Sequence, residues 1–221
     1  MKKRTLLAWS SGKDSAWALH SLRQWPDIEV KGLFCTVNEE FGRVAMHAVR
    51  VELLKRQASS IGLPIEMIPL PHPCGDSEYE AIMKAFVGRA KEAGVECFAF
   101  GDLFLEGIRE YRERSLAHTG ITPLFPLWGR ETKDLSGEMV RGGLRAKITC
   151  IDPRRLSAGF AGRDYDRGFL ESLPGAVDPC GENGEFHSFA FDGPIFKEAV
   201  KVRVGETVTR DGFVFTDLLP G

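Results

Sequence analysis

The sequence lacks the features that would place it in a membrane or on a nucleic-acid backbone. No apolar run is long enough to span a bilayer, and the short run after Met1-Lys2-Lys3-Arg4 breaks into a polar loop rather than continuing as a signal peptide. The 29 Lys and Arg are balanced by 31 Asp and Glu, so the basic excess that favours phosphate backbones is missing. We therefore expect neither a membrane partner nor a nucleic-acid partner.

Cysteine is scarce and scattered. The 5 cysteines are odd in number and form no C-x-x-C pair, which argues against a disulfide framework and against a zinc site. We expect a reduced protein in the cytoplasm. Internal repeats and low-complexity linkers are also missing, and 221 residues supply one compact unit or two small ones with an ample core.

A small polar loop near the N-terminus joins a predicted strand at residues 5–9 to a predicted helix at 16–22. The loop reads Ser10-Ser11-Gly12-Lys13-Asp14-Ser15. The free N–H groups and the dipole of a helix's first turn favour an anion there, and Lys13 adds a positive charge. The loop is therefore predicted to bind phosphates, with an ordinary turn capped by serine as the alternative.

Two common phosphate-binding motifs do not match this loop. The mononucleotide motif G-x-x-x-x-G-K-[ST] would place its first glycine at Leu7 and its hydroxyl residue at Asp14, and the dinucleotide motif G-x-G-x-x-G is absent. The loop instead resembles the S-G-G-x-D-S loop of the PP-loop pyrophosphatases, with Ser11 in place of the first glycine. That resemblance implies cleavage of ATP between its α and β phosphates, with adenylation of a substrate.

Strands and helices alternate through the first part of the chain. Besides the two elements above, we predict strands at 30–37, 65–70, 95–100 and 123–128, and helices at 49–61, 77–93 and 105–117. Residues 38–43 are expected to form a loop, His47 is expected on a helix face, and Ser77 with Glu80 reads as a capping box. The alternation predicts βαβ units and a parallel sheet with helices on both faces. Ligands bind at the carboxyl edge of such sheets, where Cys35-Thr36 and Gly101-Asp102 should join the loop.

The pattern loosens after Trp128. We predict a short helix at 135–139, strands at 144–151 and 199–204, and a hairpin that joins 206–210 to 213–215. The fold class is therefore α/β over residues 1–130, followed by a smaller α+β lobe over 131–221. A polar loop at 178–188 carries Glu182, Asn183, Glu185 and His187, which could position a substrate, bind Mg²⁺ or move protons. A solvated polar turn is the alternative.

Two blocks, residues 10–15 and 181–188, have the order and spacing of the diphthine–ammonia ligase family. The chain resembles this family over nearly its whole length. The resemblance implies a HUP-type ATP-binding domain and an ATP-dependent carboxylate–amine ligase. Such a ligase forms an acyl-adenylate with release of pyrophosphate, and ammonia then displaces AMP and leaves an amide. The second block differs from Gly-Glu-Gly-Gly-Glu-Tyr/Phe-Glu-Thr of the diphthine branch at Asn183, His187 and Ser188. The difference indicates another branch and argues against elongation factor 2 as the substrate.

The resemblance also implies roles for the residues of both blocks. ATP and Mg²⁺ are the expected cofactors, and the residues expected to bind them are Ser10, Ser11, Gly12, Lys13, Asp14, Ser15, Cys35, Thr36, Gly101 and Asp102. Lys13 is expected to stabilise the leaving pyrophosphate, and Asp14 to reach Mg²⁺. The residues expected to orient the acid or admit ammonia are Glu182, Asn183, Glu185 and His187, with Glu185 or His187 as general base.

Several alternatives stay open at this point. A PP-loop sulfurtransferase would need catalytic cysteines, for which Cys35 and Cys180 are the candidates, and a non-catalytic adenine-nucleotide-binding module would bind ATP without turnover. Asp102 has a helix N-cap as its alternative, and the arginines at 109, 112 and 114 are expected in a solvated ladder with glutamates. The acid is a small-molecule or protein carboxylate, and neither its identity nor a homodimer follows from the sequence.

Overall fold

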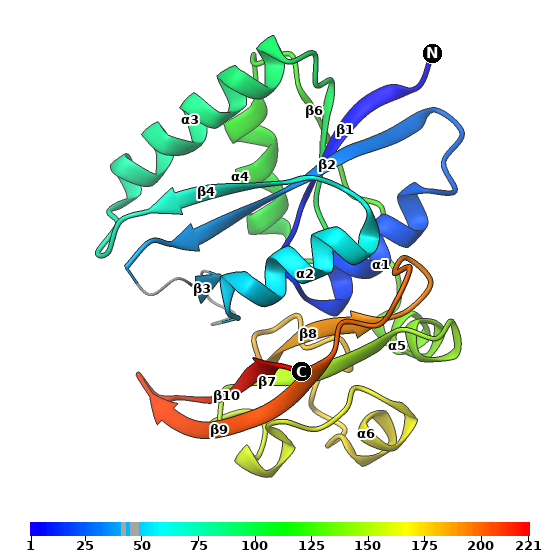
Figure 1. The fold of residues 1–221 in the computed structure, drawn as a ribbon. Helices are drawn as coiled ribbons and strands as arrows, with labels where there is room; N and C mark the ends of the chain where they lie inside the picture. The colour runs from blue at the N-terminus through cyan, green and yellow to red at the C-terminus, as the bar shows by residue number, and fades with distance from the viewer. Residues whose placement is uncertain (41–42, 45–48) are drawn as a thin grey trace.

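A computed structural model describes residues 1–40, 43–44 and 49–221, which form two lobes in contact with each other (Figure 1). The predicted position of His47, and part of the loop predicted at 38–43, lie outside the described residues. Within the described part of the chain, no helix combines the length and the apolar character needed to cross a bilayer.

The N-terminal lobe is built on a 6-stranded sheet in which β4 and β3 both pair with β2, followed by β1, β5 and β6. Its parallel strands are β1 (Lys3–Ala8), β2 (Ile28–Asn38), β4 (Ile65–Leu70), β5 (Cys97–Ala99) and β6 (Thr122–Leu124), and the short β3 (Arg43–Val44) is antiparallel to β2. The central strands are near-continuous apolar runs because both of their faces are buried. Leu7 on β1 is completely buried.

Helices cover both faces of this sheet (Figure 1). One face carries α3 (Asp76–Glu92) and α4 (Glu106–Leu116), and the other carries α1 (Lys13–Leu22) and α2 (Val51–Ile61). Successive side chains of a strand point to opposite faces. Leu33 and Cys35 therefore pack in the core on the α1 and α2 side, whereas Phe34 packs with Phe86 and Phe98 on the side of α3.

The C-terminal lobe contains a 4-stranded antiparallel sheet with the order β8-β7-β10-β9. Its elements are α5 (Thr132–Arg141), β7 (Arg145–Ile151), the 3₁₀ turn η1 (Ala158–Phe160), α6 (Arg167–Ser172), β8 (Phe186–Asp192), β9 (Val202–Arg210) and β10 (Phe213–Pro220). The sheet packs against α1 and α2, so these two helices lie between the two sheets (Figure 1). The backbone N–H of Ala190 on β8 donates to the carbonyl of Ser11 at 2.9 Å. This bond ties the second lobe to the loop at residues 10–15, which we call the phosphate loop after its predicted ligand.

The predicted fold class is confirmed, but several element boundaries differ from the predictions. Helix α3 begins at Asp76 after Gly75 and has no side-chain cap, so the predicted capping box is wrong. The strand predicted at 199–204 begins at Val202 and continues to Arg210 as the first arm of the hairpin. The end of the polar loop predicted at 178–188 is extended, because β8 begins at Phe186.

Candidate functional site

A cavity of about 1280 Å³ opens at the carboxyl edge of the parallel sheet. Eleven of the predicted site residues line it, namely Ser10, Gly12, Lys13, Asp14, Ser15, Cys35, Thr36, Gly101, Asp102, Glu182 and His187. Of the other predicted residues, Ser11 and Glu185 are buried outside this lining, and Asn183 is exposed to solvent. The tertiary structure therefore brings the phosphate loop, two strand ends and the second block around one space.

The phosphate loop turns sharply between β1 and α1. Ser11 has φ +67°, and Gly12 is the N-cap of α1 without any side-chain cap, so the serine-capped turn is wrong. The Ser15 hydroxyl donates to the Gly12 carbonyl at 2.9 Å and lies 3.3 Å from the Ser10 hydroxyl. The loop thus presents two hydroxyls beside the N-terminal end of a helix, where anions are favoured.

Gly12 and Gly101 allow other backbone segments to approach this loop closely. A Cβ atom on Gly12 would lie 3.3 Å from the Ser188 carbonyl oxygen of β8. A Cβ atom on Gly101 would lie 3.1 Å from the backbone nitrogen of Ser15, at the first turn of α1. The two glycines therefore let the second lobe and the segment after β5 approach the loop closely.

Lys13 is buried and connects the two lobes. Its ammonium donates to the two carboxylate oxygens of Asp14 at 2.8 and 3.0 Å and to the carbonyl of Cys180. Nζ also lies 5.6 Å from the ring centre of Tyr165 and 5.4 Å from that of Phe186. Burial alone would lower the pKa of Lys13, but the charge and hydrogen bond of Asp14, together with the nearby Cys180 and Glu182, outweigh it and raise that pKa above its ordinary value. Lys13 is therefore a fixed cation in the cavity wall.

Glu182 and His187 are the two ionisable side chains of the second block that line the cavity. Glu182 accepts from the backbone N–H of Leu103 at 3.0 Å. Burial, and to a smaller extent the charge of Asp14, raises the pKa of Glu182 to about 7. Burial and the charge of Lys13 lower the pKa of His187 to about 4. At neutral pH the imidazole is therefore neutral, whereas the carboxyl group of Glu182 is poised to gain or lose a proton.

Glu185 supports the loop from within the second lobe. It is 2% exposed, and its Oε1 accepts from the backbone N–H of Asp178 at 3.1 Å and from the side-chain amide of Asn183 at 3.3 Å. These contacts hold the turn that carries Glu182 toward the cavity. The roles predicted for Glu185 and Asn183 in binding or proton transfer stay predictions, as does the base role of His187.

Asp102 and Arg112 do not take the structural roles that the sequence offered as alternatives, a helix N-cap and a solvated ladder. Helix α4 begins at Glu106 with Leu105 as N-cap, so Asp102 is not a cap. Its carboxylate lies 3.6 Å from Nε of Arg112, whose guanidinium is 4.8 Å from the ring centre of Phe100. Arg109 does form the predicted ladder contact, with Glu113 at 2.8 Å, whereas Arg112 faces the cavity.

The cysteines near the site are free and buried. Burial raises the pKa of the Cys35 thiol to about 12 and that of the Cys180 thiol to about 12. A catalytic cysteine needs thiolate character at neutral pH, which these thiols do not have. Their environment disfavours the sulfurtransferase alternative.

The carboxylates in the cavity lining suit a Mg²⁺ ion that is bound mainly by the phosphates of a nucleotide. Among residues 1–40, 43–44 and 49–221, no group of three or more His, Cys, Asp or Glu is arranged to hold a metal ion alone. Protein sites for Mg²⁺–nucleotide complexes commonly supply only one or two carboxylates, because phosphates and water complete the coordination. Asp14 and Asp102, which both line the cavity, meet this requirement.

Two residues that support the site were missing from the sequence predictions. The hydroxyl of Ser188 accepts from the backbone N–H of Lys13 at 3.2 Å, and Gln57 of α2 donates to the Ser11 carbonyl at 3.0 Å. A signal for Gln57 existed, because it lies on the apolar face of α2 with Leu53, Leu54 and Ile61. A polar side chain in such a face needs a buried partner.

Comparison with family models gives matches over both parts of the chain. The model described as the diphthamide synthase N-terminal domain matches residues 2–123. The model described as the diphthamide synthase C-terminal domain matches residues 131–216.

Curated relatives with similar sequences carry the name diphthine–ammonia ligase. The bovine protein (Bos taurus) is 27% identical over 159 residues, which cover 70% of this chain and 60% of the relative. The zebrafish protein (Danio rerio) is 26% identical over 191 residues, 83% of this chain and 73% of the relative. The human protein (Homo sapiens) is 26% identical over 147 residues, 64% of this chain and 55% of the relative. The match thus spans little more than half of the human protein.

Proposed function

This chain belongs to the diphthamide synthase family, and from that premise we propose that it is an ATP-dependent amide ligase. In the proposed reaction a substrate carboxylate attacks the α-phosphorus of ATP, which gives an acyl-adenylate and releases pyrophosphate. Ammonia then attacks the acyl carbon, AMP leaves, and an amide remains. The name diphthine–ammonia ligase carried by the relatives supports ammonia as the amine.

The observation that carries the proposal is the shared cavity. Lys13 of the phosphate loop and Glu182 of the second block line the same space of about 1280 Å³. Small-molecule sites commonly have about 300–1,000 Å³, so this space accommodates a nucleotide together with a second substrate. A module that only binds nucleotide does not require a carboxyl group with a pKa of about 7 at that site.

We assign the nucleotide to residues 1–130. Ser10, Ser15 and the first turn of α1 supply donors for the phosphates, and Lys13 supplies the positive charge. Lys13 exchanges its contacts with Asp14 and Cys180 for phosphate oxygens when the nucleotide binds. Asp14 would hold a Mg²⁺ ion together with the phosphates, and that ion would supply positive charge beside the leaving group.

We assign proton transfer to the second block, within residues 131–221. Glu182 is the side chain best placed to accept a proton from the attacking amine, since it lines the cavity and its pKa lies near 7. The neutral imidazole of His187 orients the acid or the amine by hydrogen bonding. Glu185 holds the loop in place through Asp178 and Asn183.

Product analysis tests the reaction class. Incubation with ATP, ammonium and an extract of small acids is expected to yield AMP and pyrophosphate, measured by chromatography. Lys13→Ala removes a charge-assisted contact worth about 1.5–3 kcal/mol, so ATP affinity or the adenylation rate falls about ten- to hundredfold. ADP and orthophosphate as products would refute the proposal.

A second experiment tests whether the first block binds ATP and the second block acts on the acid and the amine. His187→Ala and Glu182→Gln are expected to leave ATP affinity, measured by calorimetry, nearly unchanged while they abolish amide formation. If either variant weakens ATP binding as much as Lys13→Ala does, the second block belongs to the nucleotide site.

A further inference from the structure

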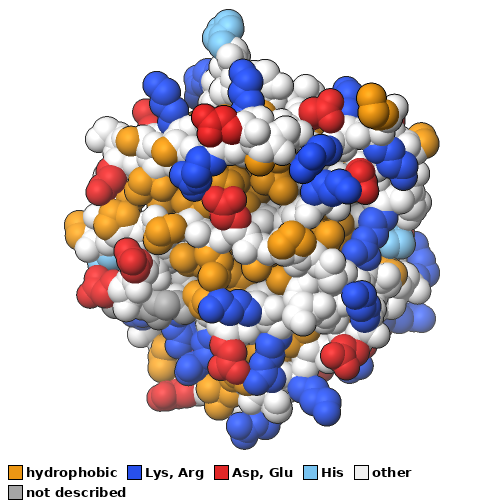
Figure 2. Space-filling model, turned by 45° about the horizontal axis from the view of Figure 1, so that its top comes forward, with side chains coloured by type: hydrophobic (Ala, Val, Ile, Leu, Met, Phe, Trp, Pro, Cys, Tyr) orange, Lys and Arg blue, Asp and Glu red, His pale blue; other side chains and the backbone are white. Residues whose placement is uncertain are grey.

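The cavity extends beyond the strand ends into the space between α3 and α4. Helix α3 packs beside β4, and α4 packs beside β6. In the strand order, β4 lies next to β2 on one side of β1, and β6 is the last strand on the other side. The central strands β1 and β5 therefore lie beneath the space between the helices. We call this part of the cavity the α3–α4 groove, and its apolar lining includes Ala8, Met83, Val87, Phe98 and Leu116. Figure 2 brings this upper side of the molecule forward and shows hydrophobic side chains recessed behind charged ones.

A glycine keeps the groove open. Gly88 lies within α3 and lines the groove, and a Cβ atom placed on it would meet no other atom within 4 Å. Glycine inside a helix lowers stability relative to alanine. Apart from proline, glycine is the residue with the lowest helix propensity, and α3 carries it at the position where any side chain would narrow the groove.

The charges of the groove have one dominant sign. Lys84 and Lys91 of α3 and Arg114 of α4 line it, and all three side chains are exposed. Glu80 is the carboxylate that α3 contributes to the lining. The other lining carboxylates, Asp14, Asp102 and Glu182, lie at the phosphate-loop end. An anionic group is thus favoured along the helices, at a distance from the reaction centre.

We infer that the α3–α4 groove binds the acid substrate, and that this acid is elongated and apolar or aromatic along its length, with a second anionic group remote from the reacting carboxylate. The reacting carboxylate must reach the nucleotide at the phosphate loop, and the apolar lining begins directly beside that loop at Ala8. The body of the acid then lies over Phe98, and its far anionic group meets Lys84, Lys91 or Arg114. The inference rests on the proposed function for the role of the acid.

Calorimetry with two probe acids tests the inference without any turnover. The protein is saturated with α,β-methylene-ATP, which cannot be cleaved between these phosphates, and is titrated with 1,4-phenylenedipropionate or 3-phenylpropionate. The diacid is expected to bind about three- to tenfold more tightly than the monoacid, as one or two exposed ion pairs allow. In the triple variant Lys84→Gln/Lys91→Gln/Arg114→Gln this preference is expected to disappear.

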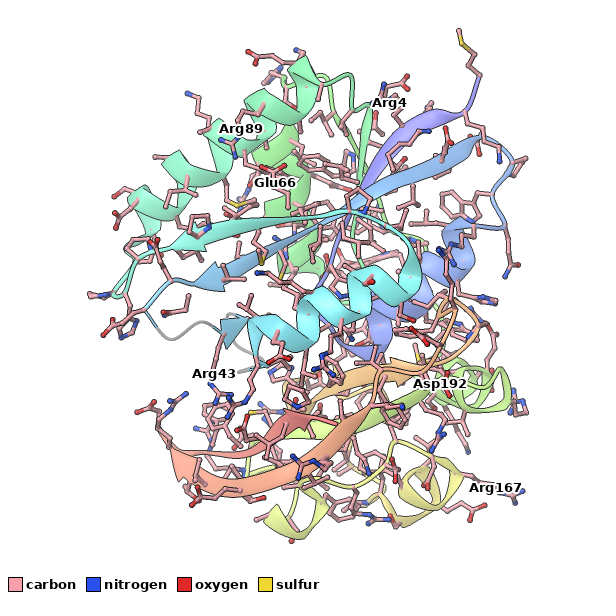
Figure 3. All side chains as sticks on the ribbon, viewed as in Figure 1. Arg4, Arg43, Glu66, Arg89, Arg167 and Asp192 are labelled. Carbon is pink, nitrogen blue, oxygen red and sulfur yellow. The ribbon has the colours of Figure 1, made fainter. Side chains whose placement is uncertain are left out.

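A steric variant separates the groove from the nucleotide site. Gly88→Trp is expected to weaken diacid binding more than about tenfold, since the indole fills the groove, while the affinity for the ATP analogue stays the same. Ala85→Trp and Arg89→Gln are the matched controls, because both positions lie on α3 outside the cavity lining. Arg89 instead pairs with Glu66 of β4 at 3.0 Å (Figure 3). Both controls are expected to bind the diacid as wild type does.

Three results would overturn the inference. The first is no saturable binding of the diacid, and the second is equal binding of the diacid by Gly88→Trp and by wild type. The third is a loss of ATP-analogue affinity in Gly88→Trp with helical circular dichroism unchanged, which would assign the groove to the nucleotide. Failure of the proposed function is distinguishable, because ADP formation would refute the ligase while leaving the diacid titrations intact.

Discussion

Ser11 occupies the strained position of the phosphate loop. Its φ of +67° lies in the left-handed region that non-glycine residues rarely adopt, and its buried hydroxyl has no hydrogen-bond partner among the described residues. The loop that this chain resembles carries glycine at the same position, and the backbone conformation explains that preference. The chain therefore tolerates a locally unfavourable residue where the loop turns.

Replacing Ser11 by glycine should stabilise the protein. The left-handed conformation costs a non-glycine residue about 1–2 kcal/mol, and the greater chain entropy of glycine offsets part of the gain, so Ser11→Gly is expected to raise the free energy of unfolding by about 1 kcal/mol. Urea denaturation measures this change. The control Ser59→Gly, at an exposed position within α2, is expected to lower stability by about 0.5 kcal/mol. A decrease for Ser11→Gly would contradict the account of strain.

Binding of a nucleotide should raise the pKa of Glu182 and so change its protonation. Its pKa of about 7 is raised by burial and by the charge of Asp14, and a bound polyphosphate adds further negative charge. The pKa then rises, so at about pH 7.5 binding of ATP takes up about half a proton at this group. Uptake vanishes well below pH 7, where the group is already protonated, and well above it, where the group stays ionised.

Calorimetry in two buffers with different ionisation enthalpies counts these protons. Glu182→Gln removes the group, so the difference in proton number between wild type and this variant isolates its contribution from the titration of ATP itself. Equal proton numbers for the two proteins would show that Glu182 does not sense the phosphates.

At the scale of helices and strands, hydrophobic periodicity carried most of the prediction. The first four parallel strands and the helices α2 and α4 lie where the apolar patterns placed them, whereas the strand predicted at 123–128 ends at Leu124 and continues as a turn. The ends of helices were predicted less well. Helix α3 has Gly75 as its N-cap and lacks the capping box that was expected at Ser77. Gly75 takes the extended conformation of an N-cap without offering a side-chain oxygen, so no capping motif in the sequence marks this start.

Helix α4 shows how tertiary contacts override a local pattern. Its charge pattern predicts a solvated ladder, and Arg109 with Glu113 follows that pattern. Arg112 turns toward Asp102 and Phe100 because the cavity edge offers a carboxylate and an aromatic face. One turn of the same helix thus serves the surface, and the next serves the site.

At the scale of the whole molecule, buried polar contacts tie the two lobes together. Gln57 is completely buried, accepts from the indole N–H of Trp9 at 2.9 Å and donates to the carbonyls of Ser11 at 3.0 Å and Ala190 at 2.6 Å. At the outer edge of the same interface, Asp217 of β10 pairs with Arg50 and with Arg43, which Figure 3 shows near the second lobe. The phosphate loop is therefore held from both lobes.

Gln57→Leu should lower the free energy of unfolding of the whole molecule. Leucine leaves the Trp9 N–H buried without a partner and removes two further hydrogen bonds, so we expect a loss of about 2–3 kcal/mol in the free energy of unfolding. Tryptophan fluorescence and far-UV circular dichroism should follow one shared transition, because the lobes unfold together. Gln24→Leu, at an exposed position after α1, is the control and should change stability by less than about 0.5 kcal/mol. Two separate transitions in wild type would contradict the coupling.

The sequence by itself determined the α/β class and the position of the loop at residues 10–15 at the carboxyl edge of a parallel sheet. These follow from local periodicity and from the topology of βαβ units. Only the tertiary structure decided which side chains of the second block face the cavity. Glu182 and Glu185 are three residues apart in one loop, yet one lines the cavity and the other is buried beneath it. The reason is physical: a buried turn must satisfy its own backbone N–H groups, and Glu185 is the carboxylate that Asp178 and Asn183 can reach.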